Sequence, residues 1–545
     1  MTTPVERFWL LLKPDKKEVF HVYVYALFNG LVNLSIPLGI QTIINFIQVG
    51  QVSTSWILLV VIVVAGVSFT GFLQLKQLRI IENLQQKLFT RSAFDFTYRI
   101  TKITSEAFQK YYPPELMNRF FDTLSIQKGL SKILVDFSIA VLQIFFGLLL
   151  LSFYHSFFIL FSIIFIFLVF ALFKLTYKRG LTTSLKESKY KYQVAYWLQE
   201  LARVKNPFKL AGDTELPLRR TDKNVDDYLV HRESHFKILR QQFLLMIVLK
   251  SIVVGGLLII GGGLVFNQQM NIGQFVAAEI IIFLIIASVE KLILSIENIY
   301  DVLTSLEKIG EVTDLELEST KGISFSSTFP TQIGIKVELA NLYFQYPNTK
   351  NCLISNFSLT INSNDRVCFT GKNGSGKSTL LHIIAGIYKH QKGIICFNDL
   401  PIENFNINSL RNFIGNGFSN NRLFHGTFFE NISLGRETVS LDDIKWATYH
   451  VGLSEFIKYL PQGLDTEIHS SDILPNSIVQ KIVLARSIVG KPRLLLLDNV
   501  FEHIEDQEKN KIIDFVIDKA NLWTLIINSS DRYLMSKCDQ VISFT

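Results

Sequence analysis

The sequence has few cysteines, only four among 545 residues. None of them stands in a close Cys-x-x-Cys pair, so the cysteines indicate neither a zinc site nor a redox motif. We expect reduced thiols in a cytosolic compartment. The sequence also lacks a patch that combines basic and aromatic residues, which argues against nucleic acid as a partner despite the net charge of +7.

Lysine and arginine are absent from three short loops, Gln48–Ser55, Ser152–Ser156 and Asn267–Gln274. The remaining segments carry all of these residues, which is the positive-inside pattern of a protein that crosses a membrane several times. We expect these three loops outside the cell and both termini in the cytoplasm. Residues 1–18 are polar and charged, and they do not have the composition of a cleavable signal peptide.

Hydrophobic residues make up 49% of the chain and concentrate before about residue 300. Six apolar stretches are long enough to cross a membrane as helices, which takes about 20 residues. They are approximately Val19–Ile47, Trp56–Leu75, Ile133–Leu151, Phe157–Tyr177, Phe243–Phe266 and Phe275–Leu294. We expect Pro37 to kink the first of them, which is tolerated inside a helix bundle.

Two polar segments between the spans, Lys76–Lys132 and Lys178–Gln242, are each more than fifty residues long. Their helical composition predicts that spanning helices continue into the cytosol. Prolines predict turning points near Phe108–Pro114 and Leu210–Pro217.

Glu279 lies inside the sixth predicted span, where a carboxylate must face protein or water. A structural hydrogen bond and a role in a substrate pathway both fit this position. The fifth span contains a glycine cluster, which fits close helix packing or a hinge. Its members are Gly255, Gly256, Gly261, Gly262 and Gly263.

The second half of the chain contains a phosphate-binding loop. The predicted strand Arg366–Thr370 leads into a glycine-rich segment, and a helix is predicted over Thr379–Ile387. The loop consists of Gly371, Lys372, Asn373, Gly374, Ser375, Gly376, Lys377, Ser378 and Thr379. Strand, glycine loop and helix in this order are the context in which such a motif binds a nucleotide.

Each part of this loop has a chemical role. The glycines let backbone N–H groups approach phosphate oxygens at the start of a helix. Lys377 reaches the β- and γ-phosphates, and the Ser378 hydroxyl is a ligand for Mg²⁺. A second apolar strand, Arg493–Leu497, ends at Asp498, whose carboxylate is expected in the magnesium shell. The sequence therefore predicts ATP and Mg²⁺ as cofactors.

With these motifs in place, the chain resembles the ATP-binding cassette exporter half-transporters over essentially its full length. The resemblance implies a six-helix transmembrane domain over residues 1–313, a linker over 314–332 and an α/β P-loop cassette over 333–545. It assigns the adenine-stacking aromatic residue to Tyr346. Phe108–Phe121 and Leu198–Leu218 resemble the two coupling regions of the family.

The sequence departs from the family pattern at its catalytic positions. Leu423–Ile432 aligns with the stretch after the glutamine loop, which puts Ser419 at the glutamine position. Asn499 follows Asp498 where the family has its catalytic glutamate. Ser530 stands at the switch histidine, or Ser529 if the alignment slips. Gln480–Ile488 matches the helix after the signature, so Leu474, Pro475, Asn476, Ser477 and Ile478 occupy the Leu-Ser-Gly-Gly-Gln signature.

These replacements predict impaired hydrolysis. An asparagine orients a water molecule but cannot accept its proton, and general-base help is typically worth about 10²–10⁴ in rate. Ser530 offers no imidazole to the γ-phosphate. Pro475 removes one backbone N–H from a segment that should bind the opposite nucleotide. Glu502 or Glu505 remains as an alternative base.

The leading hypothesis is therefore an exporter subunit of the bacterial inner membrane that binds Mg-ATP, hydrolyses it poorly and pairs with a second cassette subunit. A self-sufficient homodimeric pump and a non-transporting, ATP-gated scaffold are the alternatives. Resemblance to type I secretion systems suggests a peptide, protein or lipid-like substrate and a periplasmic adaptor. No peptidase domain precedes the first span, so we do not expect peptide processing by this chain.

Overall fold

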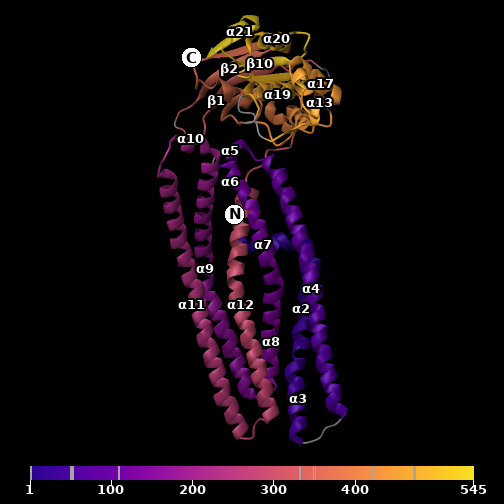
Figure 1. Ribbon diagram of the computed structural model, residues 1–545, viewed down its shortest axis with the longest axis vertical. Coiled ribbons are helices and arrows are strands. Elements are labelled where there is room, and N and C mark those ends of the chain that lie inside the picture. The colour runs from indigo at the N-terminus through magenta and orange to yellow at the C-terminus, as the bar shows by residue number, and fades with distance from the viewer. Residues whose placement is uncertain are drawn as a thin grey trace. The chain divides into compact units, whose positions relative to one another are not determined.

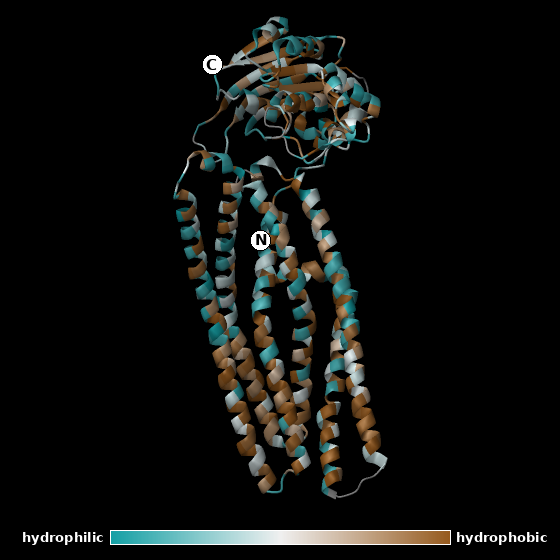
Figure 2. Cartoon of the chain, in the orientation of Figure 1, coloured by the Kyte–Doolittle hydropathy of each residue, from teal (hydrophilic) through white to brown (hydrophobic). Residues whose placement is uncertain are grey.

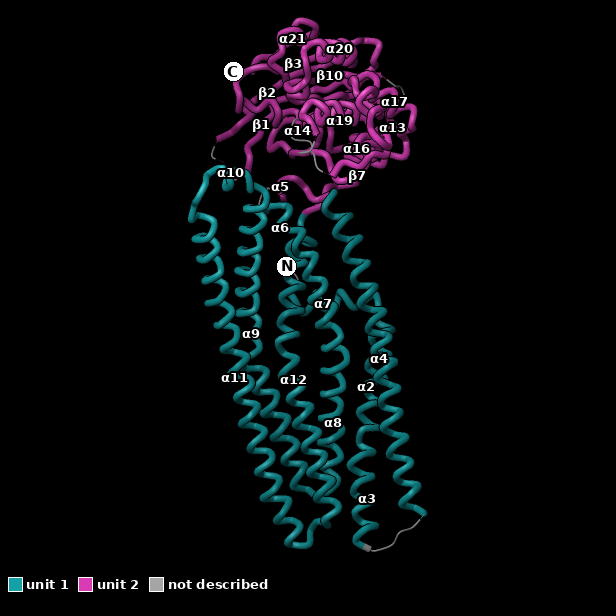
Figure 3. The backbone as a smooth tube through the Cα atoms, viewed as in Figure 1, with its two compact units in different colours: residues 1–101, 111–315 teal, residues 102–110, 316–545 magenta. Residues whose placement is uncertain are grey.

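The computed structural model describes residues 3–49, 54–108, 111–329, 333–347, 349, 351–418, 422–469 and 474–544. The chain forms two compact units, coloured separately in Figure 3. Residues 1–101 and 111–315 make the first unit, and residues 102–110 and 316–545 make the second. The boundaries predicted from the sequence, with a separate linker over 314–332, stay a prediction.

The first unit is built from helices, many of them much longer than a membrane span (Figure 1). They are α1 (Pro4–Leu12), α2 (Lys16–Asn33), α3 (Ser35–Val49), α4 (Thr54–Ile100), α6 (Pro113–Asn118), α7 (Asp122–Ser131), α8 (Ser138–Ser152), α9 (Ser156–Arg203), α10 (Lys205–Leu210), α11 (Leu216–Phe266) and α12 (Ile272–Thr313).

Six helical stretches among the described residues are long and apolar enough to cross a membrane. Each of them contains one of the six predicted spans. Figure 2 shows hydrophobic residues over one half of the long helices and hydrophilic residues over the other half. The predicted continuation of the spans as polar helices is thus present. The chain reverses direction between α9 and α11, as the prolines near Leu210–Pro217 predicted.

The first span is one helical stretch that is interrupted at a single residue, Leu34, close to Pro37. α2 ends at Asn33, and α3 begins at Ser35. Pro37 therefore lies in the first turn of a new helix, where its missing N–H has no intrahelical partner to lose.

Close contacts around α12 hold the first unit together. Half of its apolar segment is buried. A Cβ on Gly180 of α9 would lie 2.2 Å from Cζ of Tyr300 on α12, so only glycine fits there. In the glycine cluster of α11, a Cβ on Gly261 would lie 2.9 Å from the Phe275 ring, whereas the other four members face open space. Close packing thus accounts for Gly261 alone, and Glu279 is half-buried.

The second unit contains a five-stranded parallel sheet with the order β11-β3-β10-β9-β6 and an antiparallel sheet with the order β2-β1-β4-β5. A two-stranded sheet pairs β7 with β8. The strands are β1 (Val337–Phe344), β2 (Ile354–Ile361), β3 (Arg366–Gly371), β4 (Lys392–Phe397), β5 (Leu400–Pro401), β6 (Ile414–Phe418), β7 (Gly426–Thr427), β8 (Glu467–Ile468), β9 (Leu494–Asp498), β10 (Thr524–Asn528) and β11 (Gln540–Phe544).

Helices flank these sheets, as expected of an α/β P-loop fold. They are α5 (Ser105–Phe108), α13 (Phe325–Thr328), α14 (Lys377–Ile384), α15 (Ile407–Arg411), α16 (Phe428–Ser433), α17 (Leu441–His450), α18 (Ser454–Lys458), α19 (Asn476–Ile488), α20 (Asp506–Ile517) and α21 (Arg532–Lys537). The predicted strand Arg366–Thr370 lies within β3, and the predicted strand Arg493–Leu497 overlaps β9. The helix predicted over Thr379–Ile387 begins two residues earlier, at Lys377, and ends at Ile384.

Much of the segment predicted as a linker packs within the second unit. Leu317 forms an antiparallel bridge with Ile103. Glu318 pairs with Arg411, with 2.6 Å between its Oε2 and a guanidinium nitrogen. Phe325 is fully buried in an aromatic cluster with Phe329, Phe405 and Phe413. Residues 317, 318 and 325 of the predicted linker thus have specific partners, and its residues 330–332 lie outside the described residues.

A buried arginine fixes the start of the central strand β3. Arg366 is fully buried, and its guanidinium donates hydrogen bonds to the carbonyl oxygens of Ile517, Asp518 and Asn521 at 2.8–2.9 Å. Burial lowers the pKa of this guanidinium. Arg366 thus ties the beginning of β3 to the end of α20, and β3 leads directly to the phosphate-binding loop.

Candidate nucleotide-binding site

The site lies where three parallel strands end. β3, β10 and β9 are neighbours, and their register places Asn528 beside both Phe369 and Asp498. The carboxyl ends of parallel strands meet at one edge of a sheet, which is where open α/β folds bind ligands. The loop that follows β3 and the polar residues that end β9 and β10 therefore come together.

The glycines of the loop are required by its backbone. Gly376 precedes α14 with φ of 96°, a left-handed conformation that residues with a side chain rarely adopt. Gly371 has φ of 133°, and a Cβ there would lie 2.1 Å from the carbonyl oxygen of Phe544 on the neighbouring strand β11. The loop thus presents the N-terminus of α14, where backbone N–H groups and the helix dipole favour phosphate.

Lys377 is held inside the loop. Its ammonium group donates to the carbonyl oxygens of Gly371 at 2.9 Å and Lys372 at 2.7 Å, and to the Ser375 hydroxyl at 3.3 Å. These hydrogen bonds keep the positive charge at the centre of the loop. The ammonium can exchange them for phosphate oxygens, which are stronger, charge-assisted acceptors.

The two residues predicted to bind magnesium lie side by side. The Ser378 hydroxyl donates to Oδ1 of Asp498 at 3.1 Å. Adjacent oxygen ligands of an octahedral Mg²⁺ ion are about 2.9 Å apart, so this pair fits the ion with little movement. The amide of Asn528 donates to the same Oδ1 at 2.6 Å and orients the carboxylate. Sequence reasoning missed Asn528, although a polar residue that closes the apolar strand β10 was a usable signal.

A cavity of about 540 Å³ opens over this loop. It brings together predicted residues from separate parts of the chain, including Asn499 and Ser530. The lining residues are Tyr346, Leu353, Thr370, Gly371, Asn373, Gly374, Gly376, Lys377, Ser378, Thr379, Asn499, Glu502, Asn528, Ser529 and Ser530. Ser419 lies outside the described residues, and residues 474–478 are not among those that line this cavity.

Tyr346 forms one side of the cavity. Its hydroxyl lies 2.9 Å from the Thr379 hydroxyl of α14. Its ring packs edge-on against Phe344 and Tyr388, with centroid distances of 5.0 and 5.6 Å. These contacts hold the aromatic ring next to the loop, which suits an adenine-stacking residue.

Asn499 occupies the turn after β9 with φ of 49°, a left-handed conformation that asparagine tolerates better than most residues. Its backbone N–H donates to the Asn528 carbonyl oxygen at 3.0 Å. The Asn499 amide can donate to or accept from a water molecule, but it is not a base at neutral pH.

Two carboxylates remain near this turn. Glu502 is exposed and lines the cavity, whereas Glu505 lies at the N-terminus of α20 and is not among the lining residues. The geometry therefore favours Glu502 over Glu505 as an alternative base.

The residues at the signature position begin α19. Pro475 is the N-cap residue, and its carbonyl oxygen accepts hydrogen bonds from Ile478 at 2.9 Å and Val479 at 3.1 Å. Proline has no backbone N–H and no side-chain acceptor, so no side chain caps this helix at its N-cap. Leu474 and Ile478 pack into the apolar core. The segment keeps its helical start but presents fewer hydrogen-bonding groups than a Leu-Ser-Gly-Gly-Gln sequence.

Comparison with known families agrees with this geometry. Residues 354–502 match the model of the ABC transporter family, and residues 19–200 match the model of the ABC transporter transmembrane region. Both regions stand in one chain, so the chain belongs to the ATP-binding cassette transporters. The cassette implies that the site binds ATP.

Within this class the chain has the fold of an exporter half-transporter. The structure of a bacterial Atm1-family ABC exporter with ATP bound matches 97% of this chain and 93% of its own, with a TM-score of 0.81 and 16% sequence identity. This likeness confirms the predicted fold class, and the two family models confirm the predicted family.

Similar curated proteins include two from bacteria. "Uncharacterized ABC transporter ATP-binding protein YfiB" of Bacillus subtilis (strain 168) is 30% identical over 43% of this chain and 40% of its own length. "Alpha-hemolysin translocation ATP-binding protein HlyB" of Escherichia coli O157:H7 is 26% identical over 58% of this chain and 44% of its own length. The match thus spans less than half of either relative.

Replacement of Lys377 by glutamine should weaken ATP binding at least about tenfold, because a charge-assisted bond to phosphate is lost. Affinity for a fluorescent ATP analogue, measured on the full chain in detergent, checks this outcome. Lys372→Gln in the same loop is the matched control, since Lys372 is exposed and does not line the cavity. Equal affinity of the two variants would contradict the assigned role of Lys377.

Proposed function

We propose that this chain is the ATP-binding and membrane-spanning subunit of an exporter that holds Mg-ATP and hydrolyses it slowly. The proposal rests on which side chains line one cavity and lie directly beside it. Lys377, Ser378 and the neighbouring Asp498 retain the groups that grip triphosphate and magnesium, whereas Asn499 and Ser530 stand where water would be activated.

In this proposal the described residues bind and orient the nucleotide. Tyr346 stacks on the adenine ring, the loop N–H groups and Lys377 hold the phosphates, and Ser378 and Asp498 hold Mg²⁺. Mg²⁺ held by Ser378 and Asp498 would supply positive charge that neutralises the phosphates. Asn499 would hold a water molecule near the γ-phosphate without removing its proton. ATP would then act mainly as a ligand that keeps two cassettes closed.

We further propose that the partner is a second, different cassette subunit. Cassettes of this family pair head to tail, with each nucleotide between the loop of one chain and the signature of the other. In a homodimer, both sites would lack the glutamate, the histidine and the signature glycines. With a partner that has an intact glutamate, the site on the partner's loop would have a competent base. That site would face the impaired signature segment of this chain, which contains Pro475.

For location and cargo, we propose the bacterial inner membrane, with both termini in the cytoplasm. The distribution of lysine and arginine and the six candidate spans support this placement. Partial similarity to the HlyB protein, whose name includes alpha-hemolysin translocation, favours a protein or peptide substrate over a lipid-like one. A periplasmic adaptor would then be a further partner.

A self-sufficient homodimeric pump is the second candidate, and the position of Glu502 favours it. This carboxylate is exposed on the wall of the nucleotide cavity, three residues after Asn499. It could accept a proton from water if the turn after β9 moved when two cassettes close.

Replacement of Asn499 by glutamate should raise ATP hydrolysis at least about tenfold, because it restores a general base. Phosphate release by the full chain in lipid nanodiscs measures this change. Asn499→Gln is the matched control, since it has the same length as glutamate but no basic group. The proposal fails if the wild-type chain alone turns over ATP at about 1 s⁻¹ or faster.

Replacement of Glu502 by glutamine separates the two candidates. If the residual hydrolysis is not driven by Glu502, this variant should retain the wild-type rate to within about twofold, as should the control Glu505→Gln. A loss of about 10² or more in Glu502→Gln alone would favour the homodimeric pump with an alternative base.

Native mass spectrometry of the complex extracted from its own membrane with Mg-ATP should detect this chain with one copy of a second cassette subunit. Unhydrolysed ATP should remain bound to this chain, because its site has Asn499 in place of a general base and would cleave ATP slowly. A homodimer that carries only ADP would be incompatible with the proposed pairing.

A further inference from the structure

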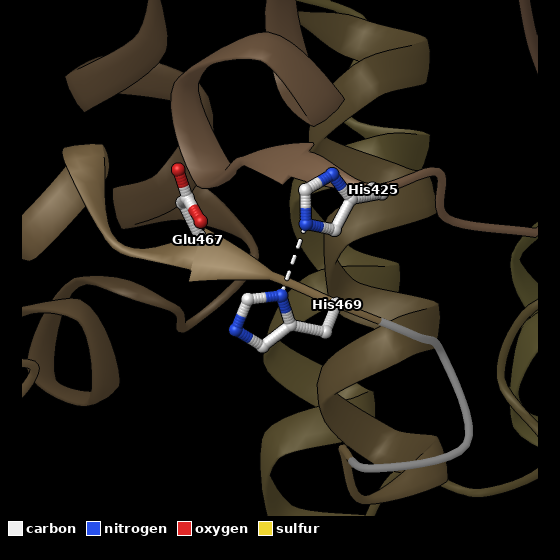
Figure 4. Close-up of side chains that lie close together, drawn as sticks. All are labelled: His425, Glu467 and His469. Atoms are coloured by element: carbon white, nitrogen blue, oxygen red, sulfur yellow. Dashed lines mark hydrogen bonds between the residues drawn. The ribbon is translucent and has the colours of Figure 1, made fainter.

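We infer that His425, Glu467 and His469 form a binding site for a divalent transition-metal ion, with zinc the best fit to their chemistry. The three residues lie on or next to the small sheet formed by β7 and β8 (Figure 4). None of them lines the nucleotide cavity. The four cysteines take no part in this site.

The backbone places the three side chains on one face of the sheet. Gly426 pairs with Ile468, and Thr427 pairs with Glu467. Extending this register by one residue sets His425 opposite His469. Side chains that are opposite each other, or two residues apart on one strand, point to the same face. His425, Glu467 and His469 therefore share a face because of strand pairing rather than by a chance approach of loops.

The distances between ligand atoms suit a metal ion. Nε2 of His425 lies 3.0 Å from Nδ1 of His469, and the two rings are stacked with 5.1 Å between their centroids. Ligand atoms of the three residues all lie within 4.8 Å of one another. Zinc binds histidine nitrogen at about 2.0–2.1 Å, so two nitrogens of a tetrahedral site are about 3.3–3.4 Å apart. The separation of the two imidazole nitrogens is close to that value, and both rings would turn so that their lone pairs converge on one ion. The Glu467 oxygen, within 4.8 Å of both nitrogens, would move closer to complete the site.

The donor set selects the class of metal. Two imidazoles and one carboxylate suit zinc and the neighbouring transition metals, whereas Mg²⁺ and Ca²⁺ prefer oxygen ligands. Without metal, one of the two facing nitrogens carries a hydrogen and donates a hydrogen bond to the other. When a metal binds, both nitrogens must offer lone pairs, so this proton moves to the second nitrogen of its own ring. Three protein ligands leave a fourth position for water.

A bound ion would join two segments that flank the cassette motifs. His425 leads into the capping box of α16, in which Thr427 and Glu430 exchange hydrogen bonds. His469 lies five residues before Leu474, where the signature position begins. A sheet with only two paired residues per strand is weak by itself. The ion would therefore stabilise the pairing of β7 with β8.

Zinc binding to the full chain tests this inference. The protein is purified in detergent with a tag free of histidine, treated with EDTA, and titrated with ZnCl₂ in the presence of Mg²⁺ and a competing chelator. Excess Mg²⁺ keeps zinc from the oxygen ligands Ser378 and Asp498. We expect one zinc ion per chain in the wild type. His425→Ala and His469→Ala should each weaken binding at least about tenfold, and Glu467→Gln should weaken it less.

His503→Ala is the matched control, because His503 is an exposed histidine of the same unit that lies outside the cluster. Two further measurements test the geometry. X-ray absorption should detect two imidazole ligands at about 2.0–2.1 Å. Hydrogen exchange at residues 425–427 and 467–469 should slow with zinc in the wild type but not in His425→Ala. The inference is overturned if the wild type retains no zinc, or if His425→Ala/His469→Ala binds zinc as tightly as the wild type.

Discussion

The carboxylate of Asp498 connects three neighbouring parts of the nucleotide site. It ends β9, accepts a hydrogen bond from Ser378 on α14 and accepts another from Asn528 at the end of β10. Because Asp498 is only 3% exposed, these bonds are formed away from bulk water, where their directional preference is strong. The bond from Ser378 thus adds a polar contact between α14 and the sheet to the apolar packing of Leu380 and Ile384. Asn499 takes its position from the same strand end.

Nucleotide binding and water activation use different physical means in this fold. Binding relies on backbone amides, on glycines with left-handed dihedral angles and on a buried lysine, all of which the loop geometry requires. In the proposed function, activation of water would rely on side chains that follow β9 and β10. Asn499 and Ser530 occupy these positions without disturbing the strands, since Asn499 still donates its backbone N–H to Asn528. The end of β9 therefore keeps its backbone hydrogen bond to β10 with an asparagine at position 499.

The sequence predicted the features that depend on local chemistry. Hydrophobicity located the six membrane segments, and the succession of strand, glycine loop and helix located the loop from Gly371 to Thr379. Contacts between distant segments were not predictable in this way. Asn528 meets Asp498 only through strand pairing, and Phe325 reaches its aromatic cluster only after the cassette has folded. His425 and His469 become neighbours only because β7 pairs with β8. No periodicity or spacing in the sequence indicates that pairing.

Residues 102–110 belong to the second unit but lie about two hundred residues before the rest of it in the sequence, which has a consequence for biosynthesis. Ile103 bridges to Leu317, Thr104 donates its N–H to the carbonyl oxygen of Glu316, and Glu106 accepts from the N–H of Lys389. A ribosome makes the first members of these pairs about two hundred residues or more before the second. The apolar segments of α8, α9, α11 and α12 are synthesised in between, and they are long and apolar enough to cross a lipid bilayer. The contacts between residues 103–106 and the rest of the second unit therefore form after the intervening helices have been made and inserted into the membrane. An isolated fragment that starts at Glu316 would lack residues 103, 104 and 106, which are the partners of Leu317, Glu316 and Lys389.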